Sequence, residues 1–157
     1  PDFFSSGVGL HVCRLKLGHQ PLLAGIKHLN RLENVLAAGE CLEVGAPEGL
    51  LEDAEGFVIS GTRSNIFVLH DGTLYTPNLS RCGVAGVQRD RVMAWASEHG
   101  LACQIARIRM NEVRTAEEIF LVNSVFGLWP VRGLPGYQRT VHPVAWKIQQ
   151  WLNDENH

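Results

Sequence analysis

The chain has 157 residues, of which 45% are hydrophobic and 19% charged, and its formal net charge at pH 7 is −2. This length suffices for one ordinary domain with a core, and the composition is that of a globular protein. The scattered charges and slightly negative balance exclude the basic surplus typical of nucleic-acid-binding proteins. The longest apolar stretches, such as residues 119–122, are far too short to cross a bilayer, so no membrane partner is expected.

The four cysteines, Cys13, Cys41, Cys82 and Cys103, stand far apart and form no C-x-x-C pair. This spacing favours reduced, mostly buried thiols in a cytoplasmic protein. The histidines form neither an H-E-x-x-H motif nor a cluster with cysteine, so no structural metal is expected. The first residues lack the features of a signal peptide and do not begin with Met, so we expect a processed chain or a piece of a longer one.

Hydrophobic periodicity predicts strands and one helix in the first half of the chain. The helix is expected at 28–38, where apolar residues fall at helical spacing, with Gly39 as its stop. Asp71-Gly72 predicts a tight hairpin because glycine tolerates the positive φ of such a turn. The predicted strands are 7–17, 49–52, 57–59, 65–69 and 73–75.

The second half alternates less regularly. Helices are predicted at 87–99 and 143–152, with a short helical turn at 111–116 capped by Asn111. The predicted strands are 101–108, 118–123 and 128–131. Strands and helices without strict β-α-β alternation indicate a single α+β domain, residues 1–157, built on a mixed sheet flanked by helices.

Lys27 differs from the other two lysines, Lys16 and Lys147, because apolar residues surround it in the sequence. Its neighbours include Leu22, Leu23, Ala24, Ile26 and Leu29. Desolvation makes a lysine amine nucleophilic and able to form a Schiff base. The alternative interpretation is a surface lysine at the start of an amphipathic helix.

Two further segments carry candidate binding groups. Gly83 and Gly86 precede the helix predicted from Val87, and the free N–H groups at a helix start can hold a phosphate. Asn123-Ser124 follows an apolar strand, a position at which polar groups often face a ligand. A plain loop and a plain turn remain the alternatives for these two segments.

Together these segments resemble a known family. Residues 24–32, 61–67, 75–77, 86–89 and 123–131 occur in the order found in the fold-type IV pyridoxal-phosphate enzymes. This family comprises branched-chain and D-amino-acid aminotransferases and aminodeoxychorismate lyases. Residues 24–33, Ala-Gly-Ile-Lys-His-Leu-Asn-Arg-Leu-Glu, look most like the lyases, and so does Asn123-Ser124, where branched-chain transaminases have Gly-Thr.

The resemblance implies the larger, cofactor-carrying domain of the D-amino-acid aminotransferase-like fold. It implies that Lys27 carries pyridoxal 5'-phosphate and that a homodimer acts on a small-molecule substrate. For a lyase, that substrate would be 4-amino-4-deoxychorismate, converted to p-aminobenzoate and pyruvate in folate biosynthesis. The resemblance implies that Gly86, Val87, Gln88 and Ser124 hold the cofactor phosphate. It also implies that Asn30 helps to fix the local geometry around Lys27 and that Asn123 contacts the substrate.

Two features depart from the family. Ser60 stands where family members carry the Glu that pairs with the pyridine nitrogen, and a neutral hydroxyl holds a proton there less well. The family's smaller N-terminal domain is absent from this sequence, so the chain is either the larger domain of a longer protein or has lost the rest. Ser60 favours a lyase, because formation of an aromatic product helps that reaction. A fold-type IV amino-acid aminotransferase and a non-catalytic remnant remain the alternatives.

Overall fold

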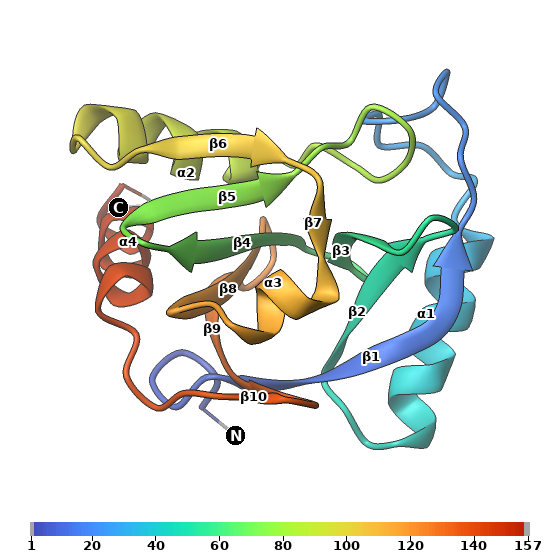
Figure 1. Ribbon diagram of the computed structural model, residues 1–157, viewed down its shortest axis with the longest axis horizontal. Coiled ribbons are helices and arrows are strands. Elements are labelled where there is room, and N and C mark those ends of the chain that lie inside the picture. The colour runs from blue at the N-terminus through green and yellow to red at the C-terminus, as the bar shows by residue number, and fades with distance from the viewer. Residues whose placement is uncertain (1, 156–157) are drawn as a thin grey trace.

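The computed structural model describes residues 2–155, which form a mixed sheet with one short helix at its centre and the other helices on its outside (Figure 1). The helices are α1 (Leu32–Glu43), α2 (Val87–Glu98), α3 (Met110–Arg114) and α4 (Pro143–Asp154). The strands are β1 (Val8–Leu17), β2 (Glu48–Asp53), β3 (Phe57–Gly61), β4 (Asn65–His70), β5 (Thr73–Pro77), β6 (Cys103–Ala106), β7 (Ile108–Arg109), β8 (Glu118–Asn123), β9 (Gly127–Leu134) and β10 (Tyr137–Gln138). The predicted α+β class is confirmed.

The strand order is β6-β5-β4-β8-β9-β1-β2-β3-β7, with β10 paired to β9. Three pairs, β1–β2, β1–β9 and β5–β6, are parallel, and the others are antiparallel. One apolar cluster contains Val58 of β3, Val68 of β4 and Ile108 of β7, which come from distant places in this order. The sheet therefore curls around a shared core, as its two sides in Figure 1 also show.

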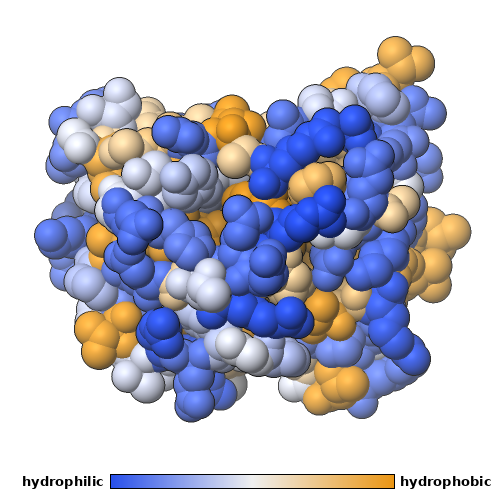
Figure 2. Space-filling view, viewed as in Figure 1, coloured by the Kyte–Doolittle hydropathy of each residue, from blue (hydrophilic) through white to orange (hydrophobic). Residues whose placement is uncertain are grey.

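The three longer helices cover the outside of the curled sheet, whereas α3 packs on the core inside it. α2 and α4 pack together over β4, β5 and β8, where Trp95 and Ile148 join Phe67 and Phe120 in a second apolar cluster. α1 lies along β1 and β2. Figure 2 shows a largely polar surface on the side viewed, with isolated apolar residues. No helix within residues 2–155 has the length and apolar character that crossing a bilayer requires.

The predicted start and end of the first helix are wrong. Residues 28–31 form a bend, in which the Asn30 backbone N–H donates to His28 Nδ1 at 3.1 Å, and α1 begins only at Leu32. The helix then runs through Gly39 because Ala37 and Cys41 on either side of it are buried against the sheet. It ends at Glu43, and Gly45, two residues later, has a φ of +68° that suits glycine.

The strand predicted at 101–108 is split in two. β6 pairs with β5 and β7 pairs with β3, so the chain crosses between two ends of the curled sheet at Arg107. The cap predicted at Asn111 is also wrong: Arg109 precedes α3, and its backbone N–H donates to Glu112 Oε2 at 2.7 Å. The hairpin at Asp71-Gly72 is confirmed, with φ of +46° and +74° at the two residues.

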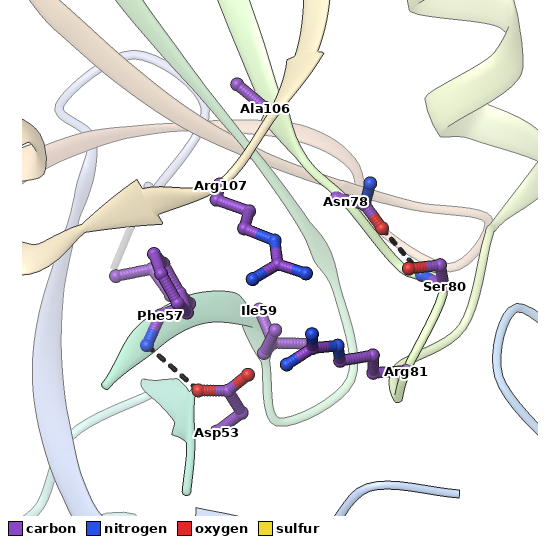
Figure 3. A pocket seen from close by; sticks show the side chains of 9 residues that line it. Asp53, Phe57, Ile59, Asn78, Ser80, Arg81, Ala106 and Arg107 are labelled. Atoms are coloured by element: carbon purple, nitrogen blue, oxygen red, sulfur yellow. Dashed lines mark hydrogen bonds between the residues drawn. The ribbon is translucent and has the colours of Figure 1, made fainter. Parts of the chain in front are cut away.

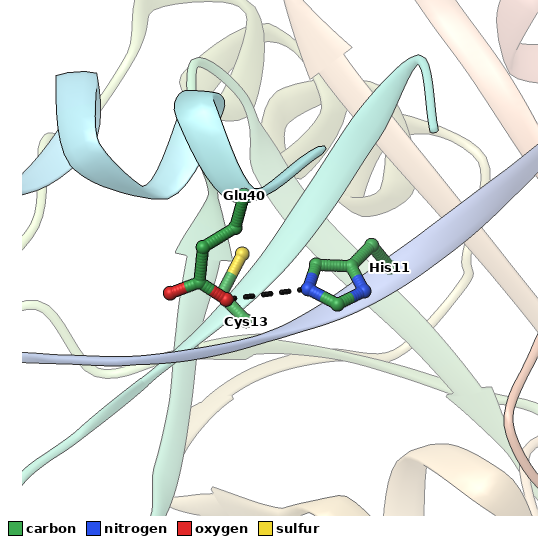
Figure 4. A group of neighbouring side chains, drawn as sticks. All are labelled: His11, Cys13 and Glu40. Atoms are coloured by element: carbon green, nitrogen blue, oxygen red, sulfur yellow. Dashed lines mark hydrogen bonds and ion pairs between the residues drawn. The ribbon is translucent and has the colours of Figure 1, made fainter. Parts of the chain in front are cut away.

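Glu40 of α1 stabilises an irregularity in β1, where the pairing with β2 shifts register between Val12 and Lys16. Its carboxylate accepts the backbone N–H groups of Arg14 at 2.7 Å and Leu15 at 2.9 Å. These bonds, the Arg14 bond foremost, lower the pKa of Glu40 to about 2. His11 Nε2 lies 3.3 Å from the same carboxylate, with Cys13 beside it (Figure 4). The grouping of His11, Cys13 and Glu40 is therefore explained by the role of Glu40 in stabilising β1 at this irregularity.

Candidate active site

A cavity of about 1110 Å³ opens beside the start of α1. Four stretches of chain line it, within residues 17–36, 60–65, 82–88 and 122–129. The structure brings all the candidate residues of the sequence to this cavity: Lys27, Asn30, Ser60, Gly86, Val87, Gln88, Asn123 and Ser124. They belong to separate loops and strand ends, so they come close to one another only in the folded chain.

Backbone hydrogen bonds hold the Lys27 loop against the loop that precedes α2. Gly25 N–H donates to Gly83 O at 2.9 Å, and Ala85 N–H donates to Gly25 O at 3.1 Å. Gln20 N–H adds a third bond, to Arg81 O, at 2.8 Å. Lys27, two residues after Gly25, is thereby fixed near the first turn of α2 within the same cavity.

The apolar surroundings predicted for Lys27 are not found in the described residues. The Leu22, Ile26 and Leu29 side chains are 84%, 54% and 100% exposed. The reason is that backbone hydrogen bonds fasten the loop of residues 21–30, which leaves these three side chains outside. Asn30 lies in the bend before α1, and so not one helical turn after Lys27. The candidacy of Lys27 therefore rests on its place in the cavity.

The start of α2 is shaped as an anion site. Gly86 caps the helix in an extended conformation, and Val87 and Gln88 follow with N–H groups that the first turn leaves without helical acceptors. Asn65 Oδ1 accepts the Gly86 N–H at 3.0 Å, and Asn65 Nδ2 donates to Val84 O at 2.7 Å. Gly86 N–H is already bonded, whereas the N–H groups of Val87 and Gln88, which line the cavity, remain for a ligand.

Asn123 connects two walls of the cavity. Its Nδ2 donates to Arg63 O at 3.1 Å, and its Oδ1 accepts the N–H groups of Val125 and Phe126 at 2.9 and 2.8 Å. The substrate contact inferred for Asn123 stays a prediction, and the structure adds a positioning function. Ser124 follows with an exposed side chain at the cavity, for which no hydrogen bond is found among the described residues.

Ser60, the residue before the last one of β3, is buried and lines the cavity. Buried Glu48, beside the following loop, was not singled out from the sequence. Its carboxylate accepts hydrogen bonds from the Thr62 N–H at 3.0 Å, the Ser64 hydroxyl at 2.9 Å and the Thr62 hydroxyl. Glu48 is engaged with that loop and does not line the cavity, whereas Ser60 does.

His19, Asp53 and Cys82 meet at the rim, with His19 Nε2 at 2.9 Å from Asp53 Oδ2. Burial opposes ionisation of Asp53, but hydrogen bonds from Phe57, His19 and Glu55 keep its pKa below the ordinary value. Burial raises the pKa of Cys82 to about 11, so its thiol is neutral at pH 7. All four cysteines are free, and three are buried, as predicted.

A second pocket lies on the other side of Asp53 (Figure 3). Arg81 and Arg107 lean over it, and Arg81 Nη1 lies 2.7 Å from Glu55 Oε1. Its volume of about 20 Å³ has room for little more than a water molecule, so it is too small for a cofactor.

The fold and the cavity define an α+β domain that presents a lysine and a helix N-terminus to one large site. The family model described as amino-transferase class IV matches residues 5–134. The chain belongs to this family.

Individual relatives are consistent with this assignment. The chain is 38% identical over 128 residues to an aminodeoxychorismate lyase from Vibrio harveyi, covering 82% of this chain and 47% of the relative. The crystal structure of 4-amino-4-deoxychorismate lyase from Pseudomonas aeruginosa superposes with a TM-score of 0.94 and 46% identity, covering 98% of this chain and 57% of that one.

A branched-chain aminotransferase from the archaeon Thermoproteus uzoniensis, solved with norvaline, superposes with a TM-score of 0.89 and 26% identity, covering 95% of this chain and 51% of that one. Both activities of the family thus occur on this fold. The chain spans about half the length of the relatives it matches.

Proposed function

We propose that this chain is the cofactor-carrying domain of a pyridoxal-phosphate-dependent lyase that converts 4-amino-4-deoxychorismate to p-aminobenzoate and pyruvate. The observation that carries the proposal is that Lys27, the first turn of α2, Ser124 and Ser60 meet in one cavity. The similarity to two aminodeoxychorismate lyases supports this substrate.

The groups present fit pyridoxal phosphate. A Cβ on Gly86 would stand 2.6 Å from Asn65 Oδ1, so the glycine keeps open the backbone turn that presents Val87 N–H and Gln88 N–H. These N–H groups and the Ser124 hydroxyl suit a phosphate. The Lys27 amine suits an aldehyde, and the Ser60 hydroxyl can donate to or accept from a ring nitrogen.

When bound, the cofactor would supply an electron sink for the substrate carbon that loses its proton. Lys27 would hold the cofactor and, when free, act as the general base at the substrate carbon that bears the nitrogen. The reaction is an elimination that balances without a co-substrate: the ring loses a proton and its bond to the enolpyruvyl oxygen, and the departing three-carbon unit gains a proton to become pyruvate. Val87 and Gln88 would anchor the phosphate so that the ring stays in register with Lys27.

The second candidate is a fold-type IV amino-acid aminotransferase. Family membership supports it, whereas Ser60 disfavours it, because a hydroxyl cannot hold the ring-nitrogen proton as a carboxylate does. Assays on the whole protein separate the two, since a lyase releases pyruvate without an added keto acid. Cofactor binding with neither product would support the third alternative, a non-catalytic member.

The role of Lys27 is tested by reduction with borohydride in the presence of pyridoxal phosphate, followed by peptide mapping. We expect the reduced label on Lys27, with visible absorbance that disappears in Lys27→Arg and persists in Lys16→Arg and Lys147→Arg. Label on Lys16 or Lys147 in place of Lys27 would overturn the assignment.

We also propose that the whole protein is a cytoplasmic homodimer with a further, smaller domain. Free, mostly buried thiols support a reducing compartment. Exposed apolar side chains near the cavity support a second subunit or domain that covers them. These side chains are Leu22, Leu29, Leu32 and Val35, which are 84%, 100%, 66% and 63% exposed. Light scattering on the whole protein, with a monomer mass as the contrary result, tests the dimer.

A further inference from the structure

The cavity carries more positive charge than a phosphate needs. Besides Lys27, its lining includes the two guanidinium groups of Arg31 and Arg63, but a single carboxylate, that of Glu33. Glu33 Oε1 is already engaged by the Gly18 N–H at 2.8 Å. This local surplus contrasts with the chain's net charge of −2 and was not predicted from the sequence. A cation surplus in a concave site attracts anionic ligands.

Neither arginine has a close carboxylate partner among the described residues. Arg31 Nη1 contacts the neutral Asn34 Oδ1 at 3.4 Å. Arg63 reaches the Pro47 carbonyl at 3.4 Å, and Glu48, the acid nearest to it, is 4.0 Å away and bonded to the loop. By contrast, Arg81 and Arg91 form ion pairs of 2.7 and 3.1 Å. Arg31 and Arg63 are therefore free to take an external anion.

One amide side chain connects the two arginines. Asn34 contacts Arg31 and also donates through Nδ2 to the backbone carbonyl of Thr62 at 2.9 Å. Thr62 is the residue before Arg63. Glu48 holds Thr62 from the other side, and Asn123 holds the Arg63 carbonyl. The Arg63 backbone is thus fixed by α1, β2 and the end of β8, while its side chain remains 62% exposed. The fixed backbone sets where the Arg63 side chain starts, and the exposed guanidinium is free to turn toward an anion in the cavity.

The same wall offers an apolar surface. Phe126 and Trp129 line the cavity and stack with ring centroids 3.8 Å apart, and Asn123 bonds both Phe126 N–H and Arg63 O. An anion held by the arginines would therefore have an aromatic face on the same wall. A carboxylate carried by a flat six-membered ring matches both features, because arginine binds carboxylates bidentately and aromatic faces stack on rings.

We propose that Arg31 and Arg63 form a subsite for a ring carboxylate of the substrate, separate from the phosphate site at Val87 and Gln88. This deepens the proposed function and rests on it, since it assigns one anionic group to the cofactor and another to the substrate. Asn34 is a positioning residue of the subsite.

The test compares benzoate with neutral benzamide as probes, by titration calorimetry on the whole protein with pyridoxal phosphate. We expect benzoate to bind about ten-fold more tightly, or about 1.4 kcal/mol. Arg31→Gln and Arg63→Gln should each weaken it about five-fold or more, and the double variant should remove the preference. Arg63→Lys should restore part of it, because charge returns without the bidentate geometry.

Arg132→Gln is the matched control, because Arg132 is exposed and outside the cavity. It should bind both probes as the unaltered chain does, and all variants should keep the same thermal midpoint and cofactor affinity. No preference for benzoate over benzamide, or the same preference in the double variant, would overturn the subsite. If the whole protein shows the arginine-dependent preference without binding pyridoxal phosphate, the proposed function fails and the subsite stands.

Discussion

Asn65 Oδ1 lies 3.0 Å from the backbone nitrogen of Gly86, in the position where a side chain on Gly86 would intrude. The same amide bonds Val84 O through Nδ2 at 2.7 Å. One side chain at the start of β4 thus fixes the turn that leads into α2. It leaves the N–H groups of Val87 and Gln88 free, and the proposed phosphate site depends on this arrangement.

Gly86→Ala should weaken the binding of pyridoxal phosphate. The new Cβ would stand 2.6 Å from Asn65 Oδ1, so the hydrogen bond breaks or the turn shifts. Loss of one such bond, about 0.5–1.5 kcal/mol, corresponds to roughly a ten-fold weaker affinity at the upper end. Fluorescence titration with the cofactor measures it. Gly39→Ala, at a helical site with no atom within 4 Å of the new Cβ, should bind normally; equal affinity in both variants would refute the prediction.

Ser124→Ala should also weaken cofactor binding, because it removes one hydrogen bond to a charged phosphate. About 1.5–3 kcal/mol is expected, or roughly ten- to a hundred-fold in affinity. Ser97→Ala, at an exposed position of α2 away from the cavity, is the control. The same titration measures both, and a Ser124→Ala protein with unaltered affinity would place the phosphate elsewhere.

Ser60→Glu should favour transamination over p-aminobenzoate formation. A carboxylate can hold the ring nitrogen in its protonated form, which transamination requires more than an elimination that yields an aromatic ring. We expect the ratio of the two rates to change ten-fold or more, about 1.4 kcal/mol of barrier. Single-turnover rates of both reactions in the whole protein are the measurement.

The uncharged Ser60→Gln controls for size at this buried position. Cofactor should also raise the thermal midpoint of Ser60→Glu more than that of Ser60→Gln, because the buried carboxylate gains its partner. Equal rate ratios in Ser60→Glu and Ser60→Gln would mean that residue 60 does not face the ring nitrogen.

Glu118→Gln should destabilise the fold through α4. The buried Glu118 carboxylate accepts Val144 N–H with one oxygen and Ala145 N–H with the other, both at 2.9 Å. A glutamine has a single acceptor oxygen, so one N–H would face an NH₂ group, at a cost of about 1–3 kcal/mol. Urea unfolding measures it. The exposed Glu98→Gln should change stability by less than about 0.5 kcal/mol, and an equally small effect at Glu118 would contradict the cap.

His142 should make stability decrease in weak acid. The side chain is fully buried, neither ring nitrogen has a partner among the described residues, and burial lowers its pKa below 6.5. Above that pH the ring is neutral in both states. As the pH falls below it, the unfolded chain gains the proton and the folded chain does not, so folding loses up to about 1.4 kcal/mol per pH unit.

Urea unfolding of the unaltered chain and of His142→Leu at pH 7, 6 and 5 tests this linkage. His142→Leu has no site for this proton. Its free energy of unfolding should therefore decrease less between pH 7 and 5 than that of the unaltered chain, by up to about 1.4 kcal/mol for each pH unit below 6.5. Parallel pH profiles for the two proteins would show that the ring takes up its proton in the folded state as well.

Local patterns in the sequence determined most of the elements. Alternation in residues 7–17 predicts β1, Asp71-Gly72 predicts the hairpin, and the spacing of Val92, Trp95 and Ala96 predicts the buried side of α2. These features depend on side-chain period and backbone freedom over a few residues, which a sequence records directly. The failures, at the start of α1 and the split of β6 from β7, occur where distant parts of the chain decide the local conformation.

The sequence by itself also singled out the motif around Lys27, Ser60 as the departure from the family, and the segments that reach the cavity. Only the tertiary structure decided that Gly25 bonds Gly83 and so brings Lys27 to the start of α2, and that Asn34 connects Arg31 to the loop of Arg63. Hydrogen bonds between residues this far apart follow from the curling of the whole sheet, and no local period encodes them. The exposure of Leu22 and Leu29 was decided in the same way, because a loop held by its backbone leaves its apolar side chains outside.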